Sequence, residues 1–384
     1  MAETLQPILL GEPRPVNVAE IEADLSALWR SAADDPALQN AVTRACTLTL
    51  LIYVESEDAG REVNDLIAEV TRQNPCRAIV LIAEPEAALA GLAAWISARC
   101  HLPAAGEKQV CSEQVTIWAR GEAAGDLSGA VLPLTVSGLP ICLWWRAGRF
   151  APPAFLEQLL RVSNHVMVDS ARFPSPETDL RDLARWVQKS SEPVTVTDLN
   201  WARITPWREL LAQCFDAAER RPYLDRLTKV RIEYERESPR VLTQRSQGLL
   251  LAGWLASRLG WRFVEAQTQE EGGPAAFLFR CGERAVRIER VARRFEGGGC
   301  GVCFSIELQA EGASPARFSF ARGLDGKVVR TLAEVPGLAP IGRTVRLEVL
   351  NEVEILNEEL KLASPDRIYE ETLRMVACMT ASAR

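Results

Sequence analysis

The sequence predicts an α/β protein, in which an N-terminal domain with a doubly wound parallel sheet precedes an α+β domain with an antiparallel sheet and C-terminal helices. Three observations lead to this prediction. The chain has 384 residues, more than one hydrophobic core usually serves. Apolar runs of strand length alternate with helical patterns as far as residue 220. Beyond Pro222 the alternation gives way to successive strands, and helices close the chain.

Six apolar runs in the first part of the chain are typical of buried strands: residues 46–54, 77–83, 110–119, 140–145, 165–168 and 194–197. Helical patterns alternate with them at residues 61–73, 86–99, 127–136, 153–162, 176–188 and 206–220. Near-continuous apolar strands, each followed by a helix, indicate a parallel sheet with helices on both faces. Right-handed crossovers then give a doubly wound domain. An amphipathic pattern at residues 16–30 predicts one helix before it.

Two helix starts carry recognisable signals. Ser175-Pro176-Glu177 offers a hydroxyl cap, a proline at the first helical position and an acid near the positive end of the helix dipole. Similarly, Thr205 is expected to cap a helix that has Pro206 at its first position.

The second part begins with a predicted strand at residues 229–234 and a long helix, with Ser238 as cap, Pro239 at the first position and Gly260 as stop. Further strands are expected at residues 262–266, 276–281, 285–290, 302–309, 317–321 and 327–331, with a turn at 271–274. Helices are predicted at residues 341–362 and 365–378. The predicted organisation is a helical extension (1–40), a doubly wound domain (41–221) and an α+β domain (222–384).

Composition excludes several classes of protein. The formal net charge of −7 argues against a general nucleic-acid binder. The basic run 284–294 alternates with apolar positions, which predicts the solvent-facing side of a strand; a partner-binding ridge is the alternative. The most apolar stretch, residues 130–145, is too short to span a membrane. With no signal pattern in the acidic N-terminus, we expect a cytoplasmic protein whose ten cysteines are mostly reduced and buried.

Polar residues follow the predicted parallel strands, where doubly wound sheets bind ligands. They are Glu55-Ser56, Glu84, Arg120, Arg146, Asp169-Ser170 and Asp198 to Asn200. This group could bind a polar ligand or a protein loop, although loops are polar wherever they occur. The turn after the first strand, residues 54–60, carries acids where a dinucleotide enzyme needs G-x-G-x-x-G, and no phosphate-binding P-loop motif occurs. No cofactor is therefore expected.

Candidates for catalysis are few. His101 and His165 are the only histidines, and both are interpreted as structural. Asp169 and Asp198 could form a carboxylate pair, but nothing in their spacing favours this over solvated loop acids. No metal site is predicted. Cys300 and Cys303 have three possible interpretations. Structural thiols are favoured, a redox-sensitive pair is second, and half of a zinc site is third.

The best interaction candidate is Trp144-Trp145-Arg146. Adjacent tryptophans on a strand face opposite sides of the sheet, and one beside Arg146 could form an aromatic–arginine anchor. The structural alternative is that two large core residues seal the sheet. Trp201, which follows the predicted strand 194–197, could likewise be either an interface residue or a core residue. The predicted partner-binding candidates are Trp144, Trp145, Arg146, Asp169, Asp198, Asn200 and Trp201.

Four segments resemble the OpcA family, the glucose-6-phosphate dehydrogenase assembly proteins of bacteria. They are residues 75–80, 111–116, 139–146 and 198–216. Within them, Arg77, Ser112, Glu113, Gln114, Trp207 and Arg208 are motif residues of unknown role. The resemblance implies a non-catalytic partner that binds glucose-6-phosphate dehydrogenase, activates it allosterically and supports the pentose phosphate pathway. The alternative is a sugar-phosphate- or nucleotide-binding enzyme that uses the carboxyl edge of the parallel sheet.

Overall fold

The computed structural model describes residues 8–9, 14–34, 42–101, 108–189, 194–235, 245–267, 275–293, 305–323, 326–347, 350–361 and 364–381. Their strands form two sheets. Sheet A contains β1 (Ile8–Leu9), β2 (Arg14–Val16), β3 (Val42–Arg44), β4 (Thr49–Val54), β5 (Arg77–Glu84), β6 (Gly91–His101), β7 (Gln109–Arg120), β8 (Ile141–Trp145), β9 (His165–Val168) and β10 (Thr195–Asp198).

The central part of sheet A confirms the predicted doubly wound topology. Its strand order is β7-β5-β4-β8-β9-β10, and each of these strands is parallel to its neighbours. Starting from β4, the chain therefore winds first toward β7 and then, from β8, toward β10. Strand β6 runs antiparallel to β7, and both β1 and β2 pair antiparallel with β6, so one side of the sheet is mixed.

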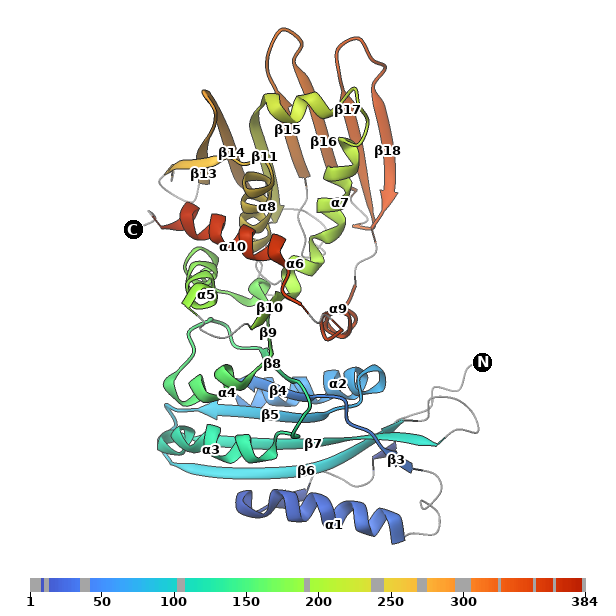
Figure 1. Cartoon of the computed structure of the whole chain (residues 1–384), viewed down its shortest axis with the longest axis vertical. Helices are drawn as coiled ribbons and strands as arrows, with labels where there is room; N and C mark the ends of the chain where they lie inside the picture. The colour runs from blue at the N-terminus through green and yellow to red at the C-terminus, as the bar shows by residue number, and fades with distance from the viewer. Residues whose placement is uncertain are drawn as a thin grey trace.

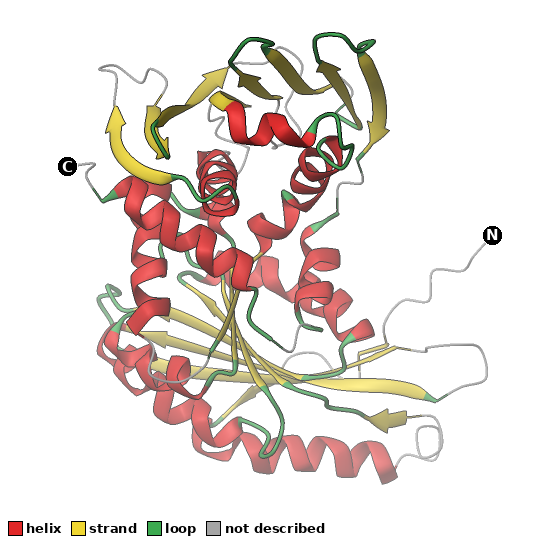
Figure 2. Cartoon of the chain, turned by 45° about the horizontal axis from the view of Figure 1, so that its top comes forward, coloured by secondary structure: helices red, strands yellow, loops and turns green. Residues whose placement is uncertain are grey.

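The helices are α1 (Ile21–Asp34), α2 (Glu57–Gln73), α3 (Leu127–Val131), α4 (Glu157–Val162), α5 (Pro176–Lys189), α6 (Leu199–Arg203), α7 (Thr205–Cys214), α8 (Arg245–Arg258), α9 (Glu352–Glu359) and α10 (Arg367–Thr380). Short 3-10 segments include η5 (Ser170–Arg172) and η6 (Arg221–Arg226). Figure 2 shows helices on both faces of sheet A.

Alternation along β4 separates two layers of core. Leu50 and Ile52 face a cluster that includes α2 and also Val353 and Leu356 of α9. Leu51 and Tyr53 face the opposite cluster, which α1, α3, α4 and α5 cover. A helix from the end of the chain therefore completes one covering layer of the N-terminal sheet. In addition, α10 packs against α5 and α8.

Sheet B has the order β12-β13-β14-β11-β15-β16-β17-β18. Its strands are β11 (Leu227–Glu235), β12 (Arg262–Gln267), β13 (Ala275–Cys281), β14 (Arg284–Arg293), β15 (Ser305–Ala310), β16 (Ala316–Arg322), β17 (Val328–Glu334) and β18 (Ile341–Arg346). All neighbours are antiparallel except β11 and β14. The prediction of an antiparallel sheet in an α+β arrangement is thus confirmed. Figure 1 shows the two sheets along the long axis, with α5, α6, α8 and α10 between them.

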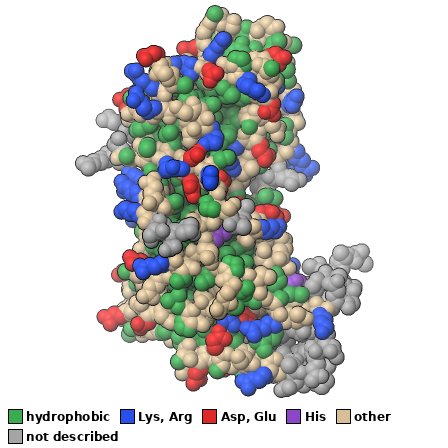
Figure 3. Space-filling view, viewed as in Figure 1, with side chains coloured by type: hydrophobic (Ala, Val, Ile, Leu, Met, Phe, Trp, Pro, Cys, Tyr) green, Lys and Arg blue, Asp and Glu red, His purple; other side chains and the backbone are tan. Residues whose placement is uncertain are grey.

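Ion pairs cover the outward side of sheet B. Glu289 on β14 binds Lys229 at 3.0 Å and Arg287 at 3.1 Å. Glu233 on β11 likewise binds Arg231 and Arg293. Arg287 and Arg293 of the basic run are therefore on the polar side of a strand, as predicted. Arg290 is an exception, because it is only 3% exposed and pairs with Glu177 of α5 at 3.0 Å. On the face in Figure 3, basic and acidic side chains are interspersed over both halves of the molecule.

Three predicted elements are wrong. The helix expected at residues 86–99 is strand β6, because pairing with β7 along its whole length outweighs the helical propensity of an alanine-rich segment. The helix expected at 341–362 is divided into β18 and α9. Helix α7 includes Thr205 rather than taking it as cap, and the short α6 precedes it. The cap expected at Ser238 and the turn at 271–274 lie outside the described residues.

A buried ion pair fixes α1 and β7 to the start of β5. Arg77 Nε donates to Glu113 Oε2 at 2.7 Å, and both residues are less than 5% exposed. Arg77 also pairs with Glu22 of α1 and donates to the carbonyl of Leu134 at 2.8 Å. Glu113 further accepts from Trp29 of α1. Two motif residues of the sequence therefore have a clear structural role.

Replacing Arg77 with methionine should destabilise the protein by about 3–5 kcal/mol, because Glu113 would stay buried without its main partner. Urea unfolding at pH 7 measures the change. Arg61→Met is the matched control, since Arg61 forms an exposed pair with Glu57 within α2. An equal, small effect of both substitutions would contradict the assigned role.

Candidate functional site

The carboxyl ends of the parallel strands form an edge that we call the rim. The direction of winding reverses between β4 and β8, which is where ligands bind in sheets of this kind. Glu55 and Ser56 follow β4, and Arg146 follows β8. The two ends are adjacent, because the Arg146 amide donates to the Tyr53 carbonyl at 3.0 Å.

The turn between β4 and α2 is built to cap a helix rather than to hold a phosphate. Ser56 Oγ accepts from the Ala59 amide at 3.2 Å, and Glu84 Oε1 accepts from the Glu57 amide at 3.2 Å. Two donors that an anion would use at the helix N-terminus are thus already bound. The carboxylates of Glu55, Glu57 and Glu84 also make this end of the helix negative.

This turn retains one glycine of the dinucleotide fingerprint. Residues 55, 57 and 60 stand where G-x-G-x-x-G has its three glycines, and only Gly60 is a glycine. A Cβ on Gly60 would lie 2.6 Å from Ile82 Cδ1, so this glycine permits close packing of α2 on β5. The positions that would approach a pyrophosphate carry glutamates instead.

Helix α9 brings a carboxylate to the reversal point. Glu352 pairs with Arg146 at 3.3 Å and with Arg172 at 3.3 Å. Arg146 also reaches Glu62 of α2 at 3.3 Å. Arg172 lies 3.7 Å from Asp169, which forms two hydrogen bonds with Arg203 at 2.6 and 3.0 Å. We call Arg146, Glu352, Arg172, Asp169 and Arg203 the rim network; it links β8, β9, α6 and α9.

A second set of contacts, the junction network, consists of Ser170, Asp198, Asn200, Ser246, Gln247 and Tyr369. Asp198 Oδ1 accepts from the amides of Ser170 and Asn200 at 2.9 Å each. Asp198 Oδ2 accepts from the Tyr369 hydroxyl at 3.3 Å. The Asn200 side chain donates to Ser170 and Ser246 and accepts from Gln247. Strand ends of sheet A are thereby joined to α8 and α10.

Two acids of this region, Asp198 and Glu359, are difficult to ionise. Burial raises the pKa of Asp198 to about 6, and the charge of Asp169 adds to this effect against the hydrogen bonds that Asp198 accepts. Burial also raises the pKa of Glu359 to about 7, with the charges of Asp198 and Asp366 acting in the same direction. Thr197 and Arg208 lower it in part. The carboxyl groups of Asp198 and Glu359 therefore lie where water is largely excluded and other acids are near.

Trp201 and Arg208 connect α6 and α7 to α10. The indole of Trp201 donates to Asp366 Oδ2 at 2.8 Å, and its ring lies 5.6 Å from that of Tyr369. The Arg208 guanidinium lies 3.5 Å from the centroid of Trp201. Desolvation lowers the pKa of this arginine to about 10, although the charges of Asp366, Glu209 and Glu359 oppose the shift. Asp366 itself caps α10.

The two adjacent tryptophans of β8 face opposite sides of the sheet, as predicted. Trp144 belongs to the core cluster under α2 and α9, whereas Trp145 belongs to the cluster on the other face. Trp145 packs on Tyr53 and Phe150 and donates to the carbonyl of Arg149 at 2.9 Å. Both tryptophans are at most 1% exposed. Their contacts in this structure are those of core residues.

All seven predicted partner-binding candidates contact other parts of this chain. Arg146, at 8%, is the most exposed of them, while Asp198 and Asn200 are fully buried. In this conformation these side chains have almost no surface with which to touch another protein. That they contact a partner stays a prediction; what the structure adds is their position in the rim network, the junction network and the core.

The remaining motif residues are also inside the fold. Ser112 Oγ accepts from the Cys76 amide at 3.3 Å. Gln114 accepts from Arg99 at 2.7 Å and donates to Asn64 at 2.6 Å. Trp207 is 1% exposed and packs in the main core.

The histidines and cysteines show little reactive chemistry. His165 is buried, its Nε2 lies 2.9 Å from Thr197 Oγ1, and burial lowers its pKa to about 4. Cys100 and Cys111 form a disulfide between paired residues of β6 and β7, an exception to the expected reduced cysteines. Cys300 and Cys303 lie outside the described residues. Within the described residues, no cluster of three or more His, Cys, Asp or Glu side chains could hold a metal ion.

Sequence reasoning missed the residues that the last 35 positions contribute. Glu352 completes the rim network, Tyr369 completes the junction network, and Asp366 binds Trp201. All three are more than 150 residues distant from these partners. One local signal was available: Asn351 and Glu354 form a capping box at the start of α9. It predicts a helix start but not the surface on which that helix packs.

Replacing Glu359 with glutamine should make the stability of the protein less dependent on pH. A carboxyl whose pKa is raised by folding stabilises the fold when protonated, and this stability is lost as the pH rises from 4.5 through about 7. At pH 8 the free energy of unfolding of the variant should exceed that of wild type by about 1–2 kcal/mol, which raises the unfolding temperature by roughly 2–4 °C. At pH 4.5 the two should coincide.

Thermal unfolding followed by circular dichroism measures this difference. Glu358→Gln is the control, because Glu358 is exposed on the same helix and pairs only with Lys361 among the described residues. A pH-independent difference between wild type and Glu359→Gln would contradict the assigned titration.

Two regions of the chain match domains of known families. Residues 67–185 match the glucose-6-phosphate dehydrogenase subunit N-terminal domain, and residues 194–373 match the corresponding C-terminal domain. The Nostoc punctiforme protein named "Putative OxPP cycle protein OpcA" is 35% identical over 336 residues, 68% of this chain and 69% of that protein. The protein of the same name in Synechocystis is 34% identical over 211 residues, which are 55% of this chain and 42% of that protein.

The fold comparison gives distant similarities. A solved dehydrogenase (MviM) from Clostridium difficile is 10% identical, with a TM-score of 0.41 over 85% of this chain and 96% of that one. Among the described helices, none has the length and apolar character that crossing a membrane requires. The two domain matches and the identity with the Nostoc protein show that the chain belongs to the OpcA family of glucose-6-phosphate dehydrogenase assembly proteins.

Proposed function

We propose that this protein is a non-catalytic assembly factor and allosteric activator that binds glucose-6-phosphate dehydrogenase in the cytoplasm and supports the oxidative pentose phosphate pathway. The family descriptions and the name of the cyanobacterial relatives support the partner and the pathway. The observation that carries the non-catalytic part is the rim. Its helix N-terminus is already capped, and its central arginine is paired with Glu352 of α9.

Ligand binding at this rim would require several intramolecular contacts to break. A pyrophosphate would meet Glu55 and Glu57, and repulsion between like charges is strong where water is partly excluded. Releasing Arg146 for an anion would leave Glu352 with Arg172 as its remaining ion-pair partner among the described residues. A scaffold with its crevice occupied in this way is better suited to presenting a fixed surface than to admitting a substrate.

Activation of a partner follows from differential binding. A protein that binds the active conformation or oligomer of the dehydrogenase more tightly than the inactive one shifts that equilibrium toward activity. The surface that does this must itself keep one shape. The two networks at the rim and the junction supply that rigidity, because they hold strand ends of sheet A and the helices α6, α8, α9 and α10 in one arrangement.

Adding the purified protein to glucose-6-phosphate dehydrogenase should yield a complex on size-exclusion chromatography. The apparent KM for glucose 6-phosphate should fall, or the turnover number should rise, by about five-fold or more, which is typical of coupling between sites. Initial rates over a range of substrate concentrations measure both quantities. No complex and an unchanged rate would refute the proposal.

The alternative, an enzyme that uses the rim for a sugar phosphate or a nucleotide, has an equally direct test. The isolated protein is incubated with sugar phosphates and nicotinamide nucleotides, and product formation is followed. Turnover that a single substitution at the rim abolishes would favour the enzyme and contradict the assembly factor.

Replacing Trp201 with phenylalanine should weaken the complex with the dehydrogenase by about five-fold while the protein stays folded. The substitution removes the hydrogen bond to Asp366 and part of the stacking surface under Arg208. It therefore loosens the contact of α6 and α7 with α10, beside the junction network, without opening a large cavity. Trp186→Phe on α5 is the matched control, since Trp186 packs on Phe150 away from the junction. Biolayer interferometry gives both affinities. Equal affinities would show that the junction does not orient the binding surface.

A further inference from the structure

A small cavity lies between α7 and the last two strands of sheet B. It measures about 40 Å³, and its lining includes Leu210, Cys214, Arg220, Phe320 and Arg343. Since one water needs roughly 10–15 Å³ on this scale, the cavity has room for about three waters or one tetrahedral ion. Its wall is partly polar and partly apolar, and it opens to solvent beside the exposed Leu332, Ile341 and Arg343.

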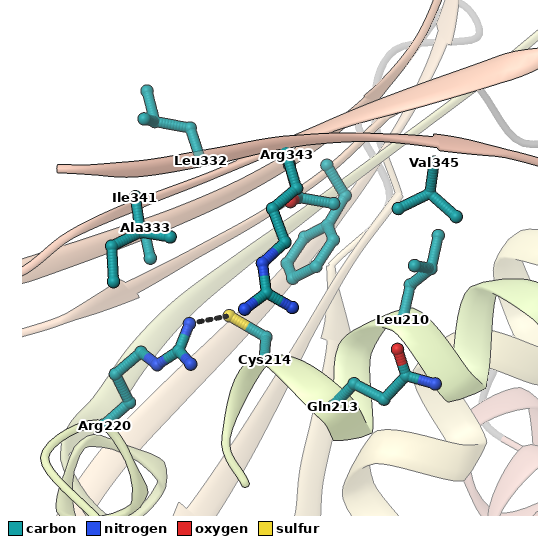
Figure 4. A pocket seen from close by; sticks show the side chains of 11 residues that line it. Leu210, Gln213, Cys214, Arg220, Leu332, Ala333, Ile341, Arg343 and Val345 are labelled. Carbon is teal, nitrogen blue, oxygen red and sulfur yellow. Dashed lines mark hydrogen bonds between the residues drawn. The ribbon is translucent and has the colours of Figure 1, made fainter. Parts of the chain in front are cut away.

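Two arginines from different elements converge on this cavity. Arg220 precedes η6 and Arg343 is on β18, and Figure 4 shows both guanidinium groups directed toward the sulfur of Cys214. Arg220 Nη1 lies 4.0 Å from that sulfur. None of the residues that line the cavity is acidic. In the part of the chain that the structure describes, neither arginine forms an ion pair.

Three arginines on the outward side of sheet B have a different environment. Arg231, Arg293 and Arg317 each bind a glutamate on the outward side. The thiol of Cys214 does not serve as the missing counter-charge. Burial raises its pKa above the ordinary value, although Arg220 and Arg343 lower it in part, so the thiol is neutral at pH 7. Two guanidinium groups thus share a partly apolar space without an anion.

We propose that this cavity binds a tetrahedral oxyanion, such as the phosphoryl group of a small metabolite, between Arg220 and Arg343. Guanidinium groups present paired N–H donors that match two oxygens of a phosphate, and such charge-assisted bonds are about twice as strong as neutral ones. On the inner side of the cavity, the buried Leu210 and Phe320 limit the access of water, which strengthens the attraction. The cavity accepts the anionic head, and the rest of a ligand extends into solvent. The site is separate from the rim and independent of the proposed partner.

The test uses inorganic phosphate, with sodium chloride at equal ionic strength as the reference and glycerol phosphate as a second arm. Phosphate should raise the unfolding temperature of the full-length protein and bind measurably by isothermal titration calorimetry. Arg220→Gln and Arg343→Gln should each weaken binding by about ten-fold or more, because each removes a hydrogen bond to a charged group. Arg330→Gln should bind as wild type, since Arg330 is exposed on the neighbouring strand outside the cavity.

A local readout locates the binding. Cys214 is alkylated with iodoacetamide, and its modification is followed by peptide mass spectrometry with and without phosphate. Bound phosphate should slow the labelling of Cys214 and leave that of the exposed Cys378 unchanged. If glycerol phosphate binds more tightly than inorganic phosphate, the natural ligand is a phosphate ester. If inorganic phosphate binds more tightly, the natural ligand is a free ion held by the same contacts. No protection of Cys214, or equal binding by all three variants, would overturn the proposal.

Discussion

The carboxylate of Asp198 is the interaction on which the arrangement of this molecule most depends. It stands at the end of β10, fully buried, and accepts hydrogen bonds from η5, from α6 and from Tyr369 of α10. Asn200 extends the same contacts to α8. Buried polar groups are costly when unsatisfied and specific when satisfied, so sheet A keeps one position relative to α8 and α10, which in turn pack against β11 and β12 of sheet B. An apolar junction of equal area would permit more sliding than this one does.

The rim shows how a doubly wound sheet can be closed by its own chain. In a dinucleotide enzyme, glycines leave the first turn open and a helix N-terminus faces the phosphates. Here glutamates occupy two of the three glycine positions, and the side chains of Ser56 and Glu84 accept hydrogen bonds from the amides at the start of α2. Glu352 of α9, about 200 residues later in the chain, pairs with Arg146. Each change favours a permanent intramolecular contact over an exchangeable ligand. A rigid surface formed in this way fits the proposed role of stabilising one state of another protein.

Charge is distributed differently in the second half of the molecule. On the outward side of sheet B, glutamates neutralise nearby arginines, which suits a solvent-facing sheet. Arg220 and Arg343 lack such partners within the described residues and enclose a cavity instead. What distinguishes this candidate binding site from the polar surface is that two arginines from different elements line one cavity that has no acidic side chain in its wall.

The sequence by itself determined the elements whose pattern admits one interpretation. β4 and β5 are continuous apolar runs, α2 has a strong helical period after a serine cap, and the adjacent tryptophans of β8 must face opposite sides. It also excluded a phosphate-binding turn, because two glutamates are visible where glycines are needed.

The tertiary structure decided the rest. Strand β6 forms because pairing with β7 outweighs the helical propensity of its alanines. Arg146, Asp198 and Trp201 could be placed at the rim from sequence, but not inside the protein. Their burial comes from α9 and α10, which lie about 150 to 200 residues later in the chain, and no local pattern specifies contacts over that distance.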